Sequence, residues 1–170
     1  FTVRTLTNNA VNWDNQGSSA TYVKGWYIDL DVLDAAATGV EFPGERATRN
    51  IQYRGGILFV NTVIPKDTAA CSVGVGGYEL AFDPSTGGSG STVIFDLDGN
   101  NNFGDEDNVD DAAGDDKIVT GIQFDGGTPS DAAFIGSRRM TQVGDEIRSF
   151  DTNTGSNSST GRTSWREITQ

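Results

Sequence analysis

The chain has 170 residues, of which 12 are basic and 24 acidic, so its formal net charge at pH 7 is −12. This length and a hydrophobic content of 35% are enough for one sizeable core, so we expect one domain or part of one. The acidic balance, with no basic stripe to displace counterions, excludes nucleic-acid binding through phosphates, and no apolar run of about 18 residues could span a membrane.

Two residue types that often carry catalysis are scarce: there is no histidine, and Cys71 is the single cysteine. Without histidine the chain has no Ser-His or Cys-His nucleophile and no imidazole ligand for a metal. A lone cysteine closes no internal disulfide and has none of the paired spacings that hold zinc. Cys71 is therefore either an inert small hydrophobe or the partner of a cysteine outside this chain, and we expect a protein that is not an enzyme.

Short runs rich in Val, Ile, Thr, Phe and Tyr alternate with clusters of Gly, Asn, Asp and Ser, which predicts an all-β chain of antiparallel strands. A polar segment over residues 1–20, a loop or an edge strand with Trp13 available as an anchor, comes first. The apolar run 57–60 indicates a strand that is buried on both faces. Arg138 and Arg139 are adjacent on one strand, so they should point to opposite faces. The predicted strands cover residues 21–30, 45–53, 57–64, 78–83, 92–97, 117–124, 132–135, 139–143, 146–150 and 162–168.

Residues 82–87 and 150–155 share the pattern Phe-Asp-x-x-Thr-Gly, and each copy follows a predicted strand. We expect the Asp to accept hydrogen bonds from turn amides, the Gly to adopt a positive φ, and another strand to follow. Such units are typical of β-propeller blades, with coincidental hairpin chemistry as the alternative. At roughly 40 to 50 residues a blade, residues 21–170 would form several antiparallel blades of a modified β-propeller but not close one. We therefore expect a fragment of a larger propeller domain whose sheet edges pair elsewhere.

The stretch from Phe95 to Val109 has the oxygen spacing of an EF-hand-type calcium loop, placed at residues 96–107. The sixth position, normally glycine, holds Asn101, the non-glycine residue that best tolerates a positive φ. The twelfth position holds Asp107 in place of the usual Glu, and because the side chain of Asp is shorter, it must come closer to the ion. Asp105 is the alternative closing ligand. The expected ligands, at positions one, three, five, seven and twelve, are Asp96, Asp98, Asn100, Asn102 and Asp107.

Charge density also favours a cation at this loop. Between Asp96 and Asp116 the chain has nine acidic residues and no basic one. Clusters of Asp, Asn and Gly form plain solvated turns as well. However, gathering so many carboxylates is unfavourable unless a cation neutralises some of them. We therefore expect Ca²⁺ at this loop, with a solvated acidic loop as the alternative.

A series of segments with a characteristic order and spacing runs through the chain, and the calcium loop is part of it. The other segments are residues 24–30, 44–46, 55–65, 71 with 76–77, 82–87, 121–122 and 161–167. Together they cover about residues 21–168 and resemble the C-terminal region of the PilY/PilC family of type IV pilus tip-associated adhesins. The resemblance implies a modified β-propeller that binds calcium through Asp96, Asp98, Asn100, the backbone carbonyl of Asn102 and a closing carboxylate.

In that family calcium occupancy is linked to the balance of pilus extension and retraction, and the proteins take part in surface adhesion and twitching motility. The resemblance therefore implies a bacterial protein exported through the periplasm to the pilus tip, the cell surface or the outer membrane. Its implied partners are minor pilins, the remainder of the adhesin chain, and a host or abiotic surface. The alternatives are a calcium-binding propeller like those of quinoprotein dehydrogenases and a secreted glycan-binding module.

Overall fold

A computed structural model of the chain describes residues 2–13, 25–30, 44–65, 76–111 and 113–154. Over these residues the chain forms short antiparallel strands and a single turn of 3-10 helix, η1 (Asp105–Asp107). None of them belongs to a helix with the length and apolar character that crossing a membrane requires.

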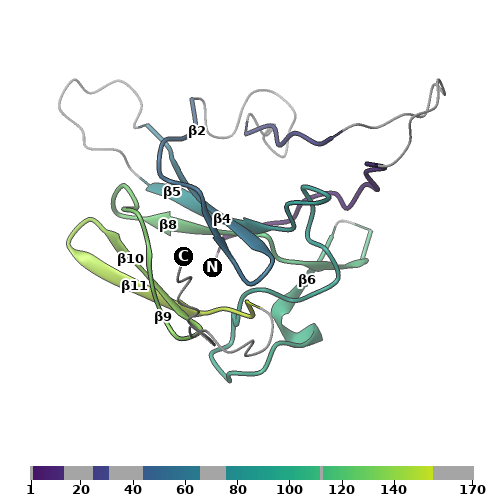
Figure 1. The fold of residues 1–170 in the computed structure, drawn as a ribbon. Helices are drawn as coiled ribbons and strands as arrows, with labels where there is room; N and C mark the ends of the chain where they lie inside the picture. Colours follow the sequence, from purple (N-terminus) through teal and green to yellow (C-terminus); the bar gives the residue numbers. More distant parts are fainter. Residues whose placement is uncertain (1, 14–24, 31–43, 66–75, 112, 155–170) are drawn as a thin grey trace, which may run out of the picture.

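Three antiparallel sheets make up the fold (Figure 1). The large sheet has the order β1-β8-β5-β4-β2, with β3 also paired to β4. Its strands are β1 (Val3–Arg4), β2 (Arg46–Ala47), β3 (Gln52–Arg54), β4 (Ile57–Val63), β5 (Gly76–Phe82) and β8 (Gly121–Asp125). The three-stranded sheet consists of β9 (Ala133–Ile135), β10 (Arg138–Val143) and β11 (Glu146–Asp151). A separate two-stranded hairpin consists of β6 (Asn108–Asp110) and β7 (Asp116–Ile118).

The core lies on both faces of the pair β4–β5, because successive side chains of a strand point to opposite faces. Phe59, opposite Ala81 in the ladder, belongs to one buried cluster, which the half-buried Phe134 and Phe150 extend. Val60 belongs to a second cluster on the other face. The predicted burial of this strand on both faces is confirmed for Phe59 and Val60, whereas Ile57 and Leu58 are half-buried.

Most of the predicted strands are confirmed, some of them with interruptions. The strands predicted at 57–64, 78–83, 132–135, 139–143 and 146–150 correspond to β4, β5, β9, β10 and β11. Those predicted at 45–53 and 117–124 are each interrupted, giving β2 with β3 and β7 with β8. The polar N-terminal segment contributes an edge strand, β1, and the indole of Trp13 donates a hydrogen bond to the Ser85 carbonyl (2.9 Å). The strand predicted at 162–168 and Cys71 lie outside the described residues.

Two strand predictions are wrong. Of residues 92–97, only Phe95 pairs, in a bridge to Thr152, because the chain turns into the acidic loop directly after it. Residues 25–30, the described part of the strand predicted at 21–30, form no ladder. Their side chains still alternate as in a strand, and Trp26 packs edge-on against Phe82 with 5.3 Å between ring centroids. The side-chain pattern therefore specified which residues face the core but not a hydrogen-bonded partner.

The first copy of the repeated motif forms the predicted turn. The Asp83 carboxylate accepts a hydrogen bond from the Ser85 amide (2.7 Å), the Gly87 amide donates to the Asp83 carbonyl (2.8 Å), and Gly87 has φ +71°. The strand expected directly after it is absent from residues 88–97. In the second copy the Asp151 carboxylate instead forms a surface ion pair with Arg138 (2.8 Å), and residue 155 lies outside the described part. The shared six-residue pattern therefore places each copy at the end of a strand, but the hydrogen bonds of the Asp side chain differ between the two copies.

We expect Gly87→Ala to destabilise the fold, because a Cβ at this positive φ would overlap the ring of Trp26. The left-handed backbone alone costs about 1–2 kcal/mol, and displacing the ring adds to that cost. Gly126→Ala is the matched control, since Gly126 also has a positive φ (+89°) but open space around it. Thermal unfolding should show a larger loss for Gly87→Ala; equal losses would mean that the Trp26 contact contributes nothing.

Candidate metal centre

The acidic loop joins two parts of the fold. It leaves the large core through Ile94 and Phe95, both buried, and it ends where η1 leads into β6. Asn101 has φ +61° and is the one non-glycine residue with positive φ among those described. The left-handed conformation predicted for the sixth position of the loop is thus confirmed.

Three carboxylates of the loop converge: Asp96, Asp98 and Asp107 each place an oxygen within 4.8 Å of the others. Asp107 is completely buried and Asp96 is 6% exposed, whereas Asp98 is exposed. Within the described part of the chain, no ion pair joins these three to a lysine or arginine. The cluster therefore concentrates negative charge at a site that is closed on its inner side and open at Asp98.

Backbone amides orient the two buried carboxylates. Asp107 Oδ1 accepts a hydrogen bond from the Leu97 amide (2.6 Å) across the loop. The two oxygens of Asp96 accept from the amides of Gly99 (2.7 Å) and Asn101 (2.9 Å). These bonds bend the chain immediately after the first ligand position. Because both side chains are buried and hydrogen-bonded, the folded loop holds the carboxylates in place.

The remaining predicted ligands form the rim of the loop. The side-chain nitrogen of Asn100 donates to Asp98 Oδ2 (2.7 Å), and Asn100 Oδ1 accepts from the backbone amide of Asn102 (2.6 Å). Asn102 also donates from its side chain to Glu106 (2.6 Å), a contact that spacing alone did not indicate. The pKa of Glu106 is lowered, first by its own backbone N–H and then by Asn102. Asp105, the alternative closing residue, begins η1, is exposed, and does not belong to the converging group.

The donor set fits calcium by its chemistry. Calcium takes six to eight oxygen ligands from carboxylates, amide side chains, backbone carbonyls and water. The loop offers three carboxylates, two asparagine side chains and backbone carbonyls, with neither sulfur nor imidazole. Two of the carboxylates are buried, and no lysine or arginine of the described residues pairs with them, which is unfavourable for a charged group. That the ion is calcium stays a prediction.

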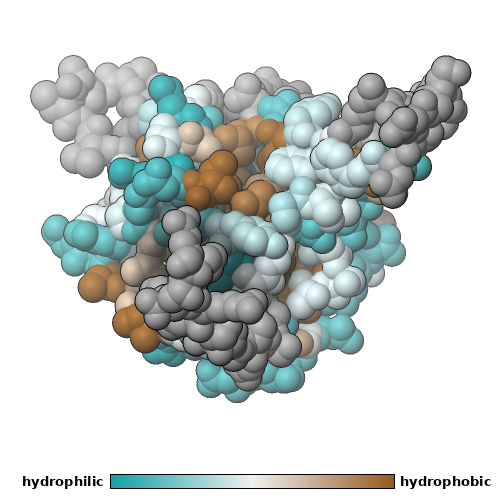
Figure 2. All heavy atoms as spheres, in the orientation of Figure 1, coloured by the Kyte–Doolittle hydropathy of each residue, from teal (hydrophilic) through white to brown (hydrophobic). Residues whose placement is uncertain are grey.

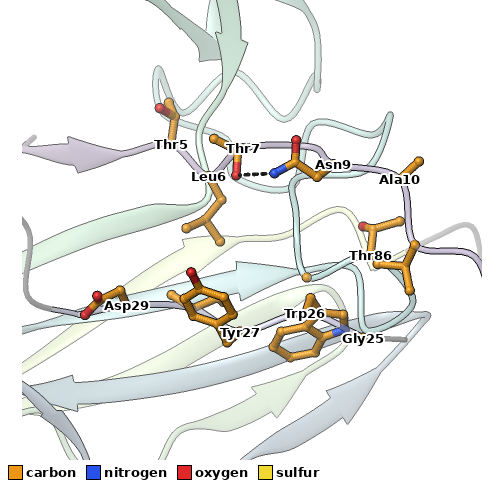
Figure 3. Close-up of a pocket in the computed structure, with 13 residues that line it drawn as sticks. Thr5, Leu6, Thr7, Asn9, Ala10, Gly25, Trp26, Tyr27, Asp29 and Thr86 are labelled. Carbon is orange, nitrogen blue, oxygen red and sulfur yellow. Dashed lines mark hydrogen bonds between the residues drawn. The ribbon is translucent and has the colours of Figure 1, made fainter. Parts of the chain in front are cut away.

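A second candidate site is a groove of about 740 Å³ between residues 5–11 and residues 25–29, bounded at one end by Thr86 and Gly87. Figure 3 shows Tyr27 and Leu6 along it, and Trp26 pointing toward the turn at Thr86. Tyr27 is 87% exposed. Sequence reasoning missed this groove because its two sides come from separate segments whose proximity no motif indicates. Aromatic and polar linings of this size are typical of small-ligand sites, but glycan binding stays an alternative prediction.

Comparisons of sequence and of structure both find similarity to PilY1 proteins. The chain is 32% identical over 96 residues to the type IV pilus biogenesis factor PilY1 of Pseudomonas aeruginosa, covering 56% of the chain and 8% of that protein. It is 29% identical over 147 residues to a PilY1 homolog of Xylella fastidiosa, covering 85% of the chain and 11% of that protein. The chain is 27% identical to PilY1 from another Pseudomonas aeruginosa strain, and this match covers 98% of the chain and 14% of that protein. No protein-family model matches.

The crystal structure of the Pseudomonas aeruginosa PilY1 C-terminal domain is similar to 70% of this chain, with a TM-score of 0.51 and 17% identity, and 22% of that domain is covered. The all-β, propeller-type fold predicted from the sequence is thereby confirmed. The chain spans between 8 and 14% of the length of the curated relatives it matches. The resemblance seen in the sequence is also confirmed: this chain is similar in sequence to the PilY1 type IV pilus biogenesis factors and in fold to the PilY1 C-terminal domain.

Proposed function

We propose that this chain is the calcium-binding, propeller-type part of a protein of the type IV pilus and that it acts as a regulatory module, not as an enzyme. Similarity to PilY1 supports the link to the pilus. The observation that carries the calcium assignment is the convergence of Asp96, Asp98 and Asp107 in a loop with EF-hand spacing. By the same similarity we propose export from the cell to the pilus tip, with minor pilins and the remainder of the chain as partners.

The mechanism that we propose is a structural clamp. Without a cation, the three carboxylates repel one another, which favours separation of Asp98 from the two buried side chains. A bound Ca²⁺ would supply the positive charge that lets them converge. Asp96 lies just after the bridge to Thr152, and Asp107 lies just before β6, so closing the loop fixes these two parts of the fold relative to each other. We propose that this change in rigidity links calcium to pilus extension and retraction, surface adhesion and twitching motility.

Replacing Asp96 and Asp98 together with Ala should abolish calcium binding, because it removes two of the three converging carboxylates. Calorimetric titration of the variant with Ca²⁺ measures this directly. The matched control is Asp110→Ala with Asp116→Ala, which removes two acidic residues paired across β6 and β7 and so reduces the net negative charge by the same amount. Unchanged affinity in the Asp96, Asp98 variant, or an equal loss in the control, would contradict the assignment.

A further inference from the structure

The three-stranded sheet is attached to the large sheet by a buried arginine. Arg139 of β10 is 2% exposed, and its Nε forms an ion pair with Glu79 of β5, which is fully buried. Its terminal nitrogens donate hydrogen bonds to Gln52 of β3 (2.9 Å) and Asn61 of β4 (2.8 Å). Thr141, also on β10, donates to the other oxygen of Glu79 (3.3 Å). One strand of the smaller sheet is thus held by three strands of the larger one.

The same three-stranded sheet holds the first ligand position of the metal centre at its other side. Where β11 ends, Phe95 forms a bridge with Thr152. The Asp96 amide donates to the Asp151 carbonyl (3.3 Å), and the Asn153 amide donates to the Ile94 carbonyl (2.8 Å). The backbone that carries the Asp96 carboxylate is therefore attached to the end of β11.

The two attachments are close in register. In the ladder of β10 and β11, Arg139 lies opposite Phe150, the residue directly before Asp151. A shift of β10 on the large sheet would therefore move Asp151, and with it the backbone of Asp96. Figure 1 shows β10 and β11 side by side at the edge of the molecule, with the large sheet next to them.

We propose that Glu79 and Arg139 are positioning residues for the metal centre: they fix β10 on the large sheet and thereby place Asp96 for calcium binding. The inference rests on the proposed calcium function and adds to it a route by which the ion affects the fold. Coupling between two sites is reciprocal, so calcium must in turn stabilise β10 and β11 against the large sheet. Part of this hairpin is exposed, with Ile147 73% accessible, so the calcium state would reach the protein surface. Figure 2 shows hydrophobic residues exposed on the side of the molecule where Figure 1 places β10 and β11.

The ion pair suits this role better than the apolar contacts around it. Phe134 and Phe150 also pack against the large sheet, but hydrophobic contacts are non-directional and define a position only loosely. The guanidinium of Arg139 reaches three different strands with hydrogen bonds of defined direction. A shift of β10 would break those bonds inside the core, where unpaired charges are unfavourable. The buried pair therefore selects one placement of the sheet.

The test compares Arg139→Lys with Arg148→Lys in the whole chain. Lysine keeps the charge opposite Glu79 but cannot reproduce the planar contacts to Asn61 and Gln52. We expect Arg139→Lys to weaken Ca²⁺ binding about tenfold, within the range usual for coupled sites, and Arg148→Lys, at an exposed residue of β11 that pairs with Glu146, to leave it unchanged. Hydrogen exchange adds a second readout, the change in exchange rate when Ca²⁺ is added at saturation, because a residue that only stabilises the fold would change the rate itself but not this response. Calcium should slow exchange of the β11 amides in the unaltered chain, and this slowing should be lost with Arg139→Lys.

The calcium affinities of the unaltered chain and of the two lysine variants distinguish the positioning role from the calcium function. If the unaltered chain binds Ca²⁺ and both lysine variants bind it equally well, the positioning role is wrong while the calcium function stands. If the unaltered chain does not bind Ca²⁺, both proposals are overturned. Should Arg139→Lys fail to fold, Thr141→Val removes one hydrogen bond to Glu79 and is expected to weaken calcium binding in the same direction. Unchanged affinity in that variant would also overturn the inference.

Discussion

Asp107→Asn is expected to lower the affinity for Ca²⁺ by roughly a hundredfold or more, beyond the loss usual for residues that only support a ligand. Asp107 is fully buried and within 4.8 Å of the oxygens of Asp96 and Asp98, so its carboxylate is the natural closing ligand. Asn keeps the shape of the side chain and an oxygen that can accept from the Leu97 amide. It removes the negative charge and the bidentate binding that a carboxylate offers. Calorimetric titration of the purified variant gives the affinity.

Asp105→Asn is the matched control because it makes the same change two residues earlier on the same 3-10 turn. Asp105 is exposed and outside the converging group, so its loss should lower the affinity only slightly, through weaker long-range attraction. The reverse order of effects would show that Asp105 closes the loop when the ion is bound.

Arg139→Met is expected to destabilise the fold by about 3–5 kcal/mol, the usual cost of leaving one member of a buried ion pair without its partner. Glu79 would then be buried with no opposing charge, and Asn61 would lose the hydrogen bond from Arg139. Combining Arg139→Met with Glu79→Leu removes both charges and should recover most of the lost stability. Urea denaturation of the single and double variants measures the difference. A double variant no more stable than the single one would contradict the unpaired charge of Glu79 as the cause of the loss.

The loss in Arg139→Met should also depend on pH. Burial raises the pKa of the Glu79 carboxyl, and Arg139 opposes that shift, so its removal raises the folded-state pKa further. A carboxyl with a folded-state pKa above its unfolded value destabilises increasingly as pH rises through that range. The variant should therefore lose less stability near pH 4, where the carboxyl is largely protonated in both states, than at neutral pH. An equal loss at both pH values would contradict the burial of an unpaired charge.

The sequence predicted most of the strands but not how the sheets meet. β4 and β5 follow from local patterns, because continuous apolar and β-branched runs favour buried strands. The ladder expected at residues 25–30 was wrong because the side-chain period shows which residues face the core, whereas pairing depends on distant chain. Arg139 likewise shows that local sequence patterns do not indicate contacts with distant residues. Its position on the face opposite to Arg138 was predictable, but its partner Glu79, 60 positions earlier, was not.

In the metal centre, spacing predicted the parts that depend on consecutive residues. The left-handed Asn101 and the convergence of Asp96 with Asp98 follow from the periodic geometry of the loop. The choice between Asp105 and Asp107 did not, because it depends on how η1 packs and on the amide of Leu97, which orients Asp107. The attachment of Asp96 to β11 also depends on tertiary structure, and no motif in the sequence indicates it.

The most direct test of the calcium assignment is a calorimetric titration of the unaltered chain, freed of metal by a chelator, first with Ca²⁺ and then, separately, with Mg²⁺. The loop predicts one Ca²⁺ site per chain and much weaker binding of Mg²⁺, which demands near-ideal octahedral geometry and keeps several of its waters. A folded chain that binds no Ca²⁺, or that binds both ions equally through many weak sites, would show that the loop is only a solvated acidic turn.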